Sequence, residues 1–236
     1  MLILFDIDGT LLRSRGAGMR CMEAAGAEIF GRPFPSDGVD FGGALDPHIY
    51  LQLCERHGLP EGAGELPRFR AAYARRLAGV LGGGAGSAHG TSGSAIAWPL
   101  PGVPALLDAL HGRPELTVGL LTGNWPETGA LKLAAAGLPV ERFVVNAWGE
   151  DGARRPDLLP VALARYAERH GRELPARRVV VVGDTPRDVE VARTHGARAL
   201  AVATGHHKAE ALAAAGADLV VQDLSETERL LEWLTA

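Results

Sequence analysis

The sequence predicts an α/β fold in which helices pack on both faces of a parallel sheet. The first observation is the apolar run Leu2–Phe5, which is short, rich in β-favouring residues and typical of a buried central strand. The second is that further apolar runs alternate with helical patterns, as in parallel α/β sheets. The expected strands are 116–121, 143–145, 179–182, 199–203 and 219–221, and the expected helices are 103–112, 126–137, 157–171, 186–196, 207–216 and 225–235.

The alternation of strands and helices fails between Leu12 and Trp98. Helical patterns appear there without apolar strands, and the gap is too long for a crossover loop. We therefore predict a small α-helical cap domain, inserted into the α/β core so that it lies over the carboxyl end of the first strand. The core is expected at 1–12 and 99–236 and the cap at 13–98, with helices near 16–30, 46–57 and 65–81.

Three local patterns refine this organisation. Asp46 and Pro47 suit the N-cap and first turn of the second cap helix. Ser225 with Glu228 has the pattern of a capping box at the start of the last helix. The Gly- and Ser-rich segment 82–95 predicts a flexible connection, which is either a hinge for a moving cap or a surface loop without a role.

Composition excludes several classes of protein. The chain has 236 residues, is 47% hydrophobic and 22% charged, and carries a net charge of −4, so we expect no nucleic-acid or membrane partner. No apolar run approaches the roughly 20 residues of a membrane span. A core strand opens the chain without a preceding basic region, which argues against a signal peptide. Cys21 and Cys54 are expected to be reduced thiols of a cytoplasmic protein.

Two aspartates follow the first strand. Asp6 and Asp8 are two residues apart, so their side chains project to the same side at the end of the sheet where open α/β folds bind ligands. Neighbouring carboxylates repel each other, and burying each one costs several kcal/mol, roughly, unless a positive charge compensates. A divalent cation is an effective compensation, and oxygen-only ligands favour Mg²⁺.

Three more clusters fall at the ends of expected core strands or just before a core helix. Thr122, Gly123 and Asn124 offer a hydroxyl and turn N–H groups that suit an anion. Asp184 follows the valine-rich strand, and Asp188 follows one helical turn later. Arg154 and Arg155, before Pro156, offer positive charge for a phosphoryl group. Each cluster alone is a weak signal.

Together, in this order, the motifs DxDGT, TGN, Arg-Pro and GDxxxD resemble those of the haloacid dehalogenase superfamily of phosphohydrolases. The resemblance covers nearly the whole chain and implies a Rossmann-like three-layer core. The insertion is similar to the helical cap of the first type in that superfamily. Within it, residues 43–47 resemble the G-x-T-D stretch of phosphoglycolate-phosphatase-like members, with Leu45 where threonine is usual.

The resemblance also implies roles for the motif residues. Asp6 would be the nucleophile that forms an aspartyl-phosphate, and Asp8 the general acid and then the general base. The residues implied to bind phosphate are Thr122, Gly123, Asn124 and Arg155, of which Thr122 and Arg155 are also catalytic. Those implied to bind Mg²⁺ are Asp6, Asp8 through its backbone carbonyl, and Asp184. Thr10 and Asp188 are implied to orient these groups.

The cation is the main departure from the superfamily pattern, which usually has lysine before the proline. Arg155 is preferred to Arg154 because it directly precedes Pro156. Lys132, in the helix after Thr122, is the alternative cation, although an exposed helix lysine is the more ordinary expectation.

The motifs favour phosphorus chemistry. Haloalkanoate dehalogenases of this superfamily do not need an acid at position 8, and a phosphonatase would need a cap lysine, which 13–98 lacks. We predict a Mg²⁺-dependent phosphomonoesterase of a small phosphorylated metabolite. The alternatives are a phosphomutase of the same superfamily and a non-catalytic protein that binds phosphate or a metabolite. The substrate and the oligomeric state are not predicted, but candidate cap residues for substrate contact are Arg13, Arg20, Asp46 and His48.

Overall fold

The computed structural model describes residues 1–59, 64–82 and 95–236. These residues contain a six-stranded sheet of order β5-β4-β1-β6-β7-β8, in which all neighbouring strands are parallel. The predicted α/β class with a Rossmann-like parallel sheet is therefore confirmed. The strands are β1 (Leu2–Phe5), β4 (Thr117–Leu121), β5 (Val145–Ala147), β6 (Val179–Gly183), β7 (Arg198–Val202) and β8 (Leu219–Val221).

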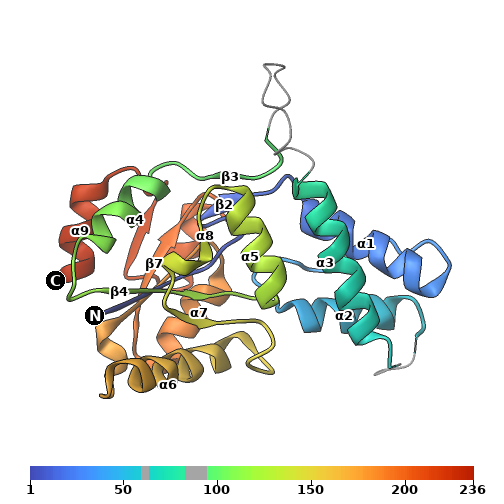
Figure 1. The fold of residues 1–236 in the computed structure, drawn as a ribbon. Coiled ribbons are helices and arrows are strands. Elements are labelled where there is room, and N and C mark those ends of the chain that lie inside the picture. The colour runs from blue at the N-terminus through green and yellow to red at the C-terminus, as the bar shows by residue number, and fades with distance from the viewer. Residues whose placement is uncertain (60–63, 83–94) are drawn as a thin grey trace.

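Helices cover both faces of the sheet and complete three layers (Figure 1). Side chains alternate along a strand, so Leu2 and Leu4 of β1 pack on one face and Ile3 and Phe5 on the other, all fully buried. The first face packs against α6 (Leu158–His170), α7 (Pro186–His195) and α8 (Ala209–Ala214), and the second against α4 (Val103–His111), α5 (Pro126–Ala135) and α9 (Thr227–Thr235).

Three further helices lie together to one side of the sheet (Figure 1). They are α1 (Ala17–Phe30), α2 (Asp46–Arg56) and α3 (Leu66–Gly82), and we call the described residues from 14 to 97 the helical segment. Helix α3 packs against both α1 and α5. The expected flexible connection at 82–95 lies, apart from its end residues, outside the described residues.

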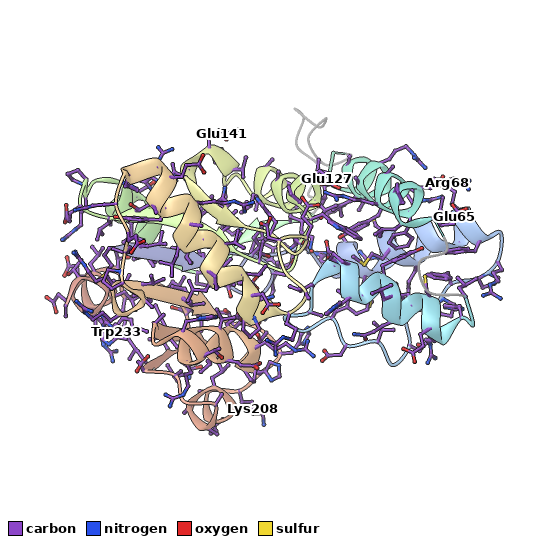
Figure 2. All side chains as sticks on the ribbon, turned by 90° about the horizontal axis from the view of Figure 1, so that it is seen from below. Glu65, Arg68, Glu127, Glu141, Lys208 and Trp233 are labelled. Carbon is purple, nitrogen blue, oxygen red and sulfur yellow. The ribbon has the colours of Figure 1, made fainter. Side chains whose placement is uncertain are left out.

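An ion-pair cluster also joins the helical segment to the core. The guanidinium of Arg70 in α3 lies 2.5 Å from Glu127 Oε1 of α5 and 2.5 Å from Glu150 Oε2. Figure 2 shows Glu127 at the junction of the two parts, whereas Trp233 lies toward the end of the core away from the helical segment. Because Arg70 binds two carboxylates at once, it fixes α3 relative to the loop that carries Glu150.

A short antiparallel pair was not predicted. Strands β2 (Leu12–Arg13) and β3 (Trp98–Pro99) pair where the chain leaves the core and where it returns. Two residues are too few to show a hydrophobic period, so sequence pattern alone does not reveal them. Both connections of the helical segment therefore run side by side.

The predicted capping box at the last helix is wrong. Helix α9 begins at Thr227 with Glu226 as its N-cap residue, and no side chain caps it. The backbone N–H of Ser225 instead donates to the carboxylate of Asp223 at 2.8 Å. Ser225 is therefore part of a turn that precedes the helix, and this turn moves the start of the helix by two residues.

Candidate active site

The carboxyl ends of the neighbouring strands β4, β1 and β6 bring the motif residues around one cavity. Asp6 and Asp8 follow β1, Gly123 and Asn124 follow β4, and Asp184 follows β6. All five line a cavity of about 770 Å³ between the sheet and the helical segment. Open parallel sheets bind ligands at this edge, so the cavity is the candidate active site.

Three buried aspartates meet at the sheet side of the cavity. Asp6, Asp184 and Asp188 each offer a carboxylate oxygen within 4.8 Å of the others. Burial raises the pKa of Asp6 to about 6. The positive charge of Arg155 lowers this pKa, whereas the negative charges of Asp188 and Asp8 raise it. Burial also raises the pKa of Asp184, and Asp6 and Asp188 raise it further. Negative charge at this place therefore requires a neighbouring cation.

Arg155 supplies positive charge inside this cluster. Its Nη2 lies 2.8 Å from Asp6 Oδ1 and 2.6 Å from Asp188 Oδ1, and only 4% of its side chain is exposed. The side chain of Arg154 is 75% exposed and pairs with Asp157. The structure therefore places Arg155, rather than Arg154, at the cavity.

Asp188 is held by hydrogen bonds to both of its carboxylate oxygens. Oδ1 accepts from Arg155, and Oδ2 accepts from the backbone N–H and the hydroxyl of Thr185 at 3.1 and 2.7 Å. These bonds form the capping box of α7, in which Thr185 is the N-cap residue. Since protein donors engage both of its oxygens, Asp188 serves to orient Arg155.

Asp6 and Asp184 have the oxygens that suit a cation. The hydroxyl of Thr10 donates to Asp184 Oδ1 at 2.9 Å. The other side of that carboxylate lies against Gly9, where a Cβ would collide with it and where φ is +84°. Arg155 binds Asp6 through Oδ1. Buried carboxylate oxygens arranged in this way fit a hard divalent cation.

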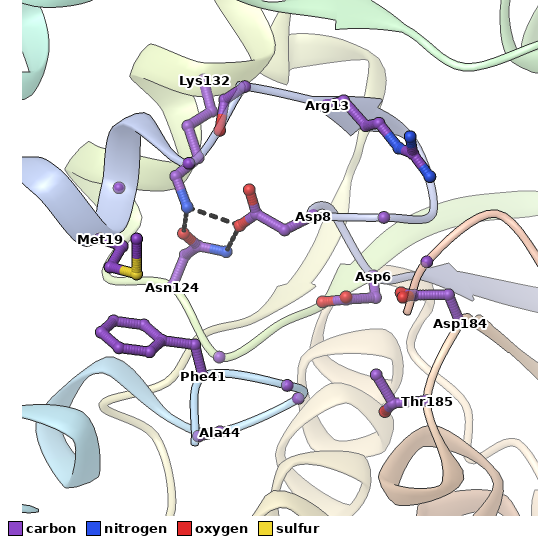
Figure 3. A pocket seen from close by; sticks show the side chains of 18 of the residues that line it. Asp6, Asp8, Arg13, Met19, Phe41, Ala44, Asn124, Lys132, Asp184 and Thr185 are labelled. Carbon is purple, nitrogen blue, oxygen red and sulfur yellow. Dashed lines mark hydrogen bonds and ion pairs between the residues drawn. The ribbon is translucent and has the colours of Figure 1, made fainter. Parts of the chain in front are cut away.

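A second group of residues holds Asp8 (Figure 3). Lys132 Nζ lies 2.5 Å from Asp8 Oδ2 and 2.5 Å from Asn124 Oδ1, and Asn124 Nδ2 donates to the same Asp8 oxygen at 3.0 Å. The expectation of an exposed Lys132 is wrong, because only 6% of its side chain is exposed, against 42% for Asp8. Burial lowers the pKa of Lys132, but Asp8, Tyr73 and Asp46 raise it by more, so the side chain is an ammonium.

Asp46 does not cap its own helix as predicted. Leu45 is the N-cap residue of α2, and Asp46 is the first residue of the helix. The carboxylate of Asp46 crosses to the core, where Oδ2 accepts from the N–H of Trp125 at 3.0 Å and from the hydroxyl of Thr128 at 3.3 Å. The N–H of Asp46 donates to the carbonyl of Gly123 at 2.7 Å. Asp46 therefore joins the helical segment to the start of α5.

Residues 40–44 lie directly on the core beside Asp46. A Cβ on Gly123 would overlap the carbonyl oxygen of Ala44, so this close approach requires glycine. Arg187 of α7 pairs with Asp40 at 2.8 Å and donates to a carbonyl in the same stretch. Arg155 also donates to a carbonyl of this stretch, at 2.9 Å. The arginine of the acidic cluster thus contacts both parts of the molecule.

Some of the other predicted site residues line the cavity and others do not. Of the described residues, Arg13 lines it, whereas Arg20 and His48 do not. Thr122 is fully buried behind the turn and does not line it either. The hydroxyl of Thr122 accepts a hydrogen bond from Asn124 Nδ2 at 2.9 Å. Thr122 therefore contacts the site through Asn124.

Several lining residues were not predicted. Met19, Phe41 and Trp98 bring apolar side chains to the cavity, and His206 and His207 reach it from the loop after β7. No motif marks the first three, because their patterns also fit a packed helix or an ordinary loop. The histidines carried a usable signal, since they follow an expected strand end just as the motif residues do.

Comparisons with known proteins agree with this fold. The family model for HAD-hydrolase-like proteins matches residues 152–227. A phosphoglycolate phosphatase of Vibrio parahaemolyticus serotype O3:K6 (strain RIMD 2210633) is 26% identical over 235 residues, covering 95% of this chain and 93% of the relative.

Solved structures share the fold across the whole chain. A hydrolase from Pseudomonas syringae has a TM-score of 0.71 at 21% identity and covers 99% of this chain and 98% of its own. CbbY from Rhodobacter sphaeroides, solved in complex with phosphate, has a TM-score of 0.65 at 20% identity, with 95% of each chain covered. The predicted resemblance to the haloacid dehalogenase superfamily is thereby confirmed, and the chain is similar to hydrolases of the phosphatase type.

We predict that Asp46→Asn changes how stability depends on pH. Burial raises the pKa of Asp46 to about 6 from an unfolded value of 3.8, with Lys132 opposing and Asp8 reinforcing the shift. The folded protein therefore binds more protons between these values, and ionisation of Asp46 costs stability as pH rises through about 6. The unfolding free energy of the variant relative to wild type should rise by roughly 2–3 kcal/mol between pH 4 and pH 7.

Urea unfolding of both proteins at several pH values measures this difference. Asparagine retains an oxygen that accepts both bonds from α5, so the variant should fold. Asp37→Asn, at an exposed aspartate, is the matched control and should give a difference that does not vary with pH. The same flat result for Asp46→Asn would show that Asp46 is not held at a raised pKa.

Proposed function

We propose that this chain is a Mg²⁺-dependent phosphomonoesterase that hydrolyses a small phosphorylated metabolite. The observation that carries the proposal is that Asp6, Asp8, Arg155 and Asp184 line one cavity. Such hydrolysis requires a nucleophile, a group that moves the leaving-group proton and positive charge for the phosphoryl oxygens. The similarity to a phosphoglycolate phosphatase supports this chemistry.

Asp6 is the nucleophile of this proposal. Its carboxylate oxygen bonds to phosphorus while the bond between phosphorus and the ester oxygen breaks, which gives an aspartyl-phosphate. Asp8 donates its proton to the departing alkoxide. In the second step Asp8 takes a proton from the attacking water, and the new oxygen–phosphorus bond displaces the Asp6 carboxylate. Inorganic phosphate leaves, and both side chains return to their starting states.

Arg155 and the turn after β4 bind the phosphoryl group. The guanidinium of Arg155 already donates to Asp188, Asp6 and a carbonyl of residues 40–44, and its positive charge neutralises charge that builds on the phosphoryl oxygens. Gly123 and Asn124 line the same cavity, and the backbone N–H of Gly123 would donate to a phosphoryl oxygen. Thr122 lies behind them, and we assign it to holding Asn124 through their 2.9 Å hydrogen bond.

Asp6, the backbone carbonyl of Asp8 and Asp184 would hold Mg²⁺. When bound, the ion stabilises negative charge on the phosphoryl oxygens. The raised pKa values of Asp6 and Asp184 support this proposal, because they reflect buried negative charge that a divalent ion offsets. Thr10 orients Asp184 through its hydroxyl, as Asp188 orients Arg155.

Lys132 is a positioning residue for Asp8. It and Asn124 both donate to Asp8 Oδ2, which fixes the rotamer of the carboxylate. Because Oδ2 already has two donors, Oδ1 is the oxygen that exchanges the proton. The 42% exposure of the Asp8 side chain gives that oxygen access to a ligand. Lys132 thus acts on the reaction through Asp8.

The helical segment acts as the cap over this site. We propose a core of 1–12 and 99–236 and a cap of 13–98, since β2 and β3 pair where the chain crosses between them. Residues of the cap that line the cavity then contact the part of the substrate beyond the phosphoryl group.

The location that we propose is the cytoplasm. Cys21 and Cys54 are both buried free thiols, which fits a reducing compartment. Within the described residues, no helix combines the length and the apolarity that crossing a membrane requires.

Phosphate release with Mg²⁺ and with EDTA tests the proposed function. We expect turnover of phosphorylated metabolites that chelation abolishes and added Mg²⁺ restores. Turnover that EDTA leaves unchanged contradicts the metal dependence. Binding of these compounds without release under any divalent ion would identify a binding protein, and a rearranged phosphorylated product would identify a phosphomutase.

We predict that Asp6→Asn abolishes hydrolysis without unfolding the protein. Loss of the nucleophile should lower turnover by at least about 10³-fold. The melting temperature should stay the same or rise, because the substitution removes one of several buried, mutually repelling carboxylates. Thermal unfolding and phosphate release on the same samples measure both effects. A variant that unfolds would instead make Asp6 a structural residue.

We predict that Lys132→Met affects substrates according to their leaving group. Alkyl phosphates need a proton on the departing oxygen, whereas the p-nitrophenolate ion leaves without one. General acid catalysis contributes about 10²–10⁴-fold, so kcat/KM for ethyl phosphate should fall by tenfold or more, roughly. The kcat/KM for p-nitrophenyl phosphate should fall much less, because it does not include the second step, in which Asp8 acts on water for both substrates. Steady-state kinetics with both substrates measure the ratio.

Lys208→Met is the matched control, because Lys208 is the second lysine of the chain and is exposed. It should leave both rates unchanged. Asp8→Asn should show the same leaving-group pattern as Lys132→Met, and the double variant should lose little more than either. Equal losses on the two substrates would argue that Lys132 contacts phosphate or only supports the fold.

A further inference from the structure

The cavity has two chemically different ends. The sheet end carries the carboxylates and Arg155, where the phosphoryl group reacts in the proposed function. The volume of about 770 Å³ is far more than a phosphoryl group needs, and cavities of roughly 300–1,000 Å³ hold ligands of drug size. Apolar side chains on the helical segment and β3 line the other end: Met19, Met22, Phe41, Ile49 and Trp98.

The apolar side chains at this end are partly uncovered. Met19 of α1 is 41% exposed although it lines the cavity, and Phe41 is partly exposed as well. Behind them Met22 and Ile49 are buried, at 1% and 3% exposure. Figure 3 shows Met19 and Phe41 among the side chains at the same cavity as Asp6. A ligand group that covers them removes apolar surface from water, and the methionine adapts to its shape.

Three charged side chains that line the cavity already make contacts within the protein. The guanidinium of Arg15 lies over the ring of Trp98, 5.3 Å from its centroid. Asp46 accepts its hydrogen bonds from the start of α5. Arg13 donates to the carbonyl of Thr204. A second acidic group on the substrate would therefore compete with existing contacts, whereas an apolar group would not.

We propose that the alcohol part of the substrate carries an apolar group, aliphatic or aromatic, that packs on Met19 and Phe41. The inference rests on the proposed phosphomonoesterase function and adds the chemical class of the alcohol. It separates this chain from an enzyme for a small phosphorylated acid, because a carboxylate packed on Met19 and Phe41 would lose hydration against apolar side chains.

A homologous series of substrates tests the proposal. Ethyl, butyl and hexyl phosphate share the same primary leaving oxygen and differ only in apolar length. Burial of each methylene is worth about fourfold in binding, so kcat/KM should rise about 15-fold from ethyl to butyl phosphate. Phosphoglycolate should be a poorer substrate than butyl phosphate. Initial rates with Mg²⁺ give both comparisons.

Variants locate the effect in the cavity. Met19→Ala and Phe41→Ala should each lower the ratio of kcat/KM for butyl over ethyl phosphate by several-fold. Leu51→Ala is the matched control, because Leu51 is an apolar residue of α2 with similar exposure, 36%, that does not line the cavity. It should leave the ratio unchanged.

The outcomes separate this proposal from the proposed function. Turnover that is independent of chain length, or a preference for phosphoglycolate, overturns the apolar class and leaves the phosphomonoesterase intact. If wild type turns over none of these compounds, the phosphomonoesterase function fails, and calorimetry then decides the inference alone. Tighter binding of butyl than of ethyl phosphate, reduced in Met19→Ala, would support the apolar subsite, and equal binding would overturn it.

Discussion

Asp6, Asp184 and Asp188 bring three carboxylates within 4.8 Å of one another where water barely reaches. Such a cluster is unstable unless positive charge and hydrogen bonds compensate, and the surrounding structure provides both. Arg155 pairs with two of the three. The capping box of α7 holds the second oxygen of Asp188, and the hydroxyl of Thr10 holds one oxygen of Asp184. In the proposed function, a phosphoryl group and a divalent ion would enter a site whose carboxylates are already partly paired with positive charge and hydrogen-bond donors.

Arg155 also connects the acidic cluster to the helical segment. Arg155 donates to a carbonyl of residues 40–44, and Asp46 donates to and accepts from the turn that precedes α5. The helical segment is therefore docked on the very groups that bind the phosphoryl oxygens in the proposed mechanism. Movement of one part relative to the other would change the hydrogen bonds of Arg155 and of Gly123.

The motif residues at the strand ends were predictable because their positions follow from local pattern and sheet topology. An apolar run ending in Asp6, or a valine run ending before Asp184, fixes a strand and the side from which its last residue projects. Lys132 was not predictable in this way. The hydrophobic period of α5 shows on which face of the helix Lys132 lies. Whether that face meets the carboxylate of Asp8 depends on how α5 packs beside β1. The prediction that Asp46 caps its own helix is wrong for the same reason, since its partners Trp125 and Thr128 are far from it in sequence.

The sequence alone determined the parallel α/β class, the helical insertion and the acidic motifs, because hydrophobic period and short motifs are local properties of the chain. The tertiary structure decided which cation pairs with the acidic cluster, which residues hold Asp8, and that Met19 and Phe41 line the same cavity as Asp6. Those features depend on the meeting of segments distant in sequence. Their energies arise from burial and from pairing across the interface between the sheet and the helices, which no local pattern encodes.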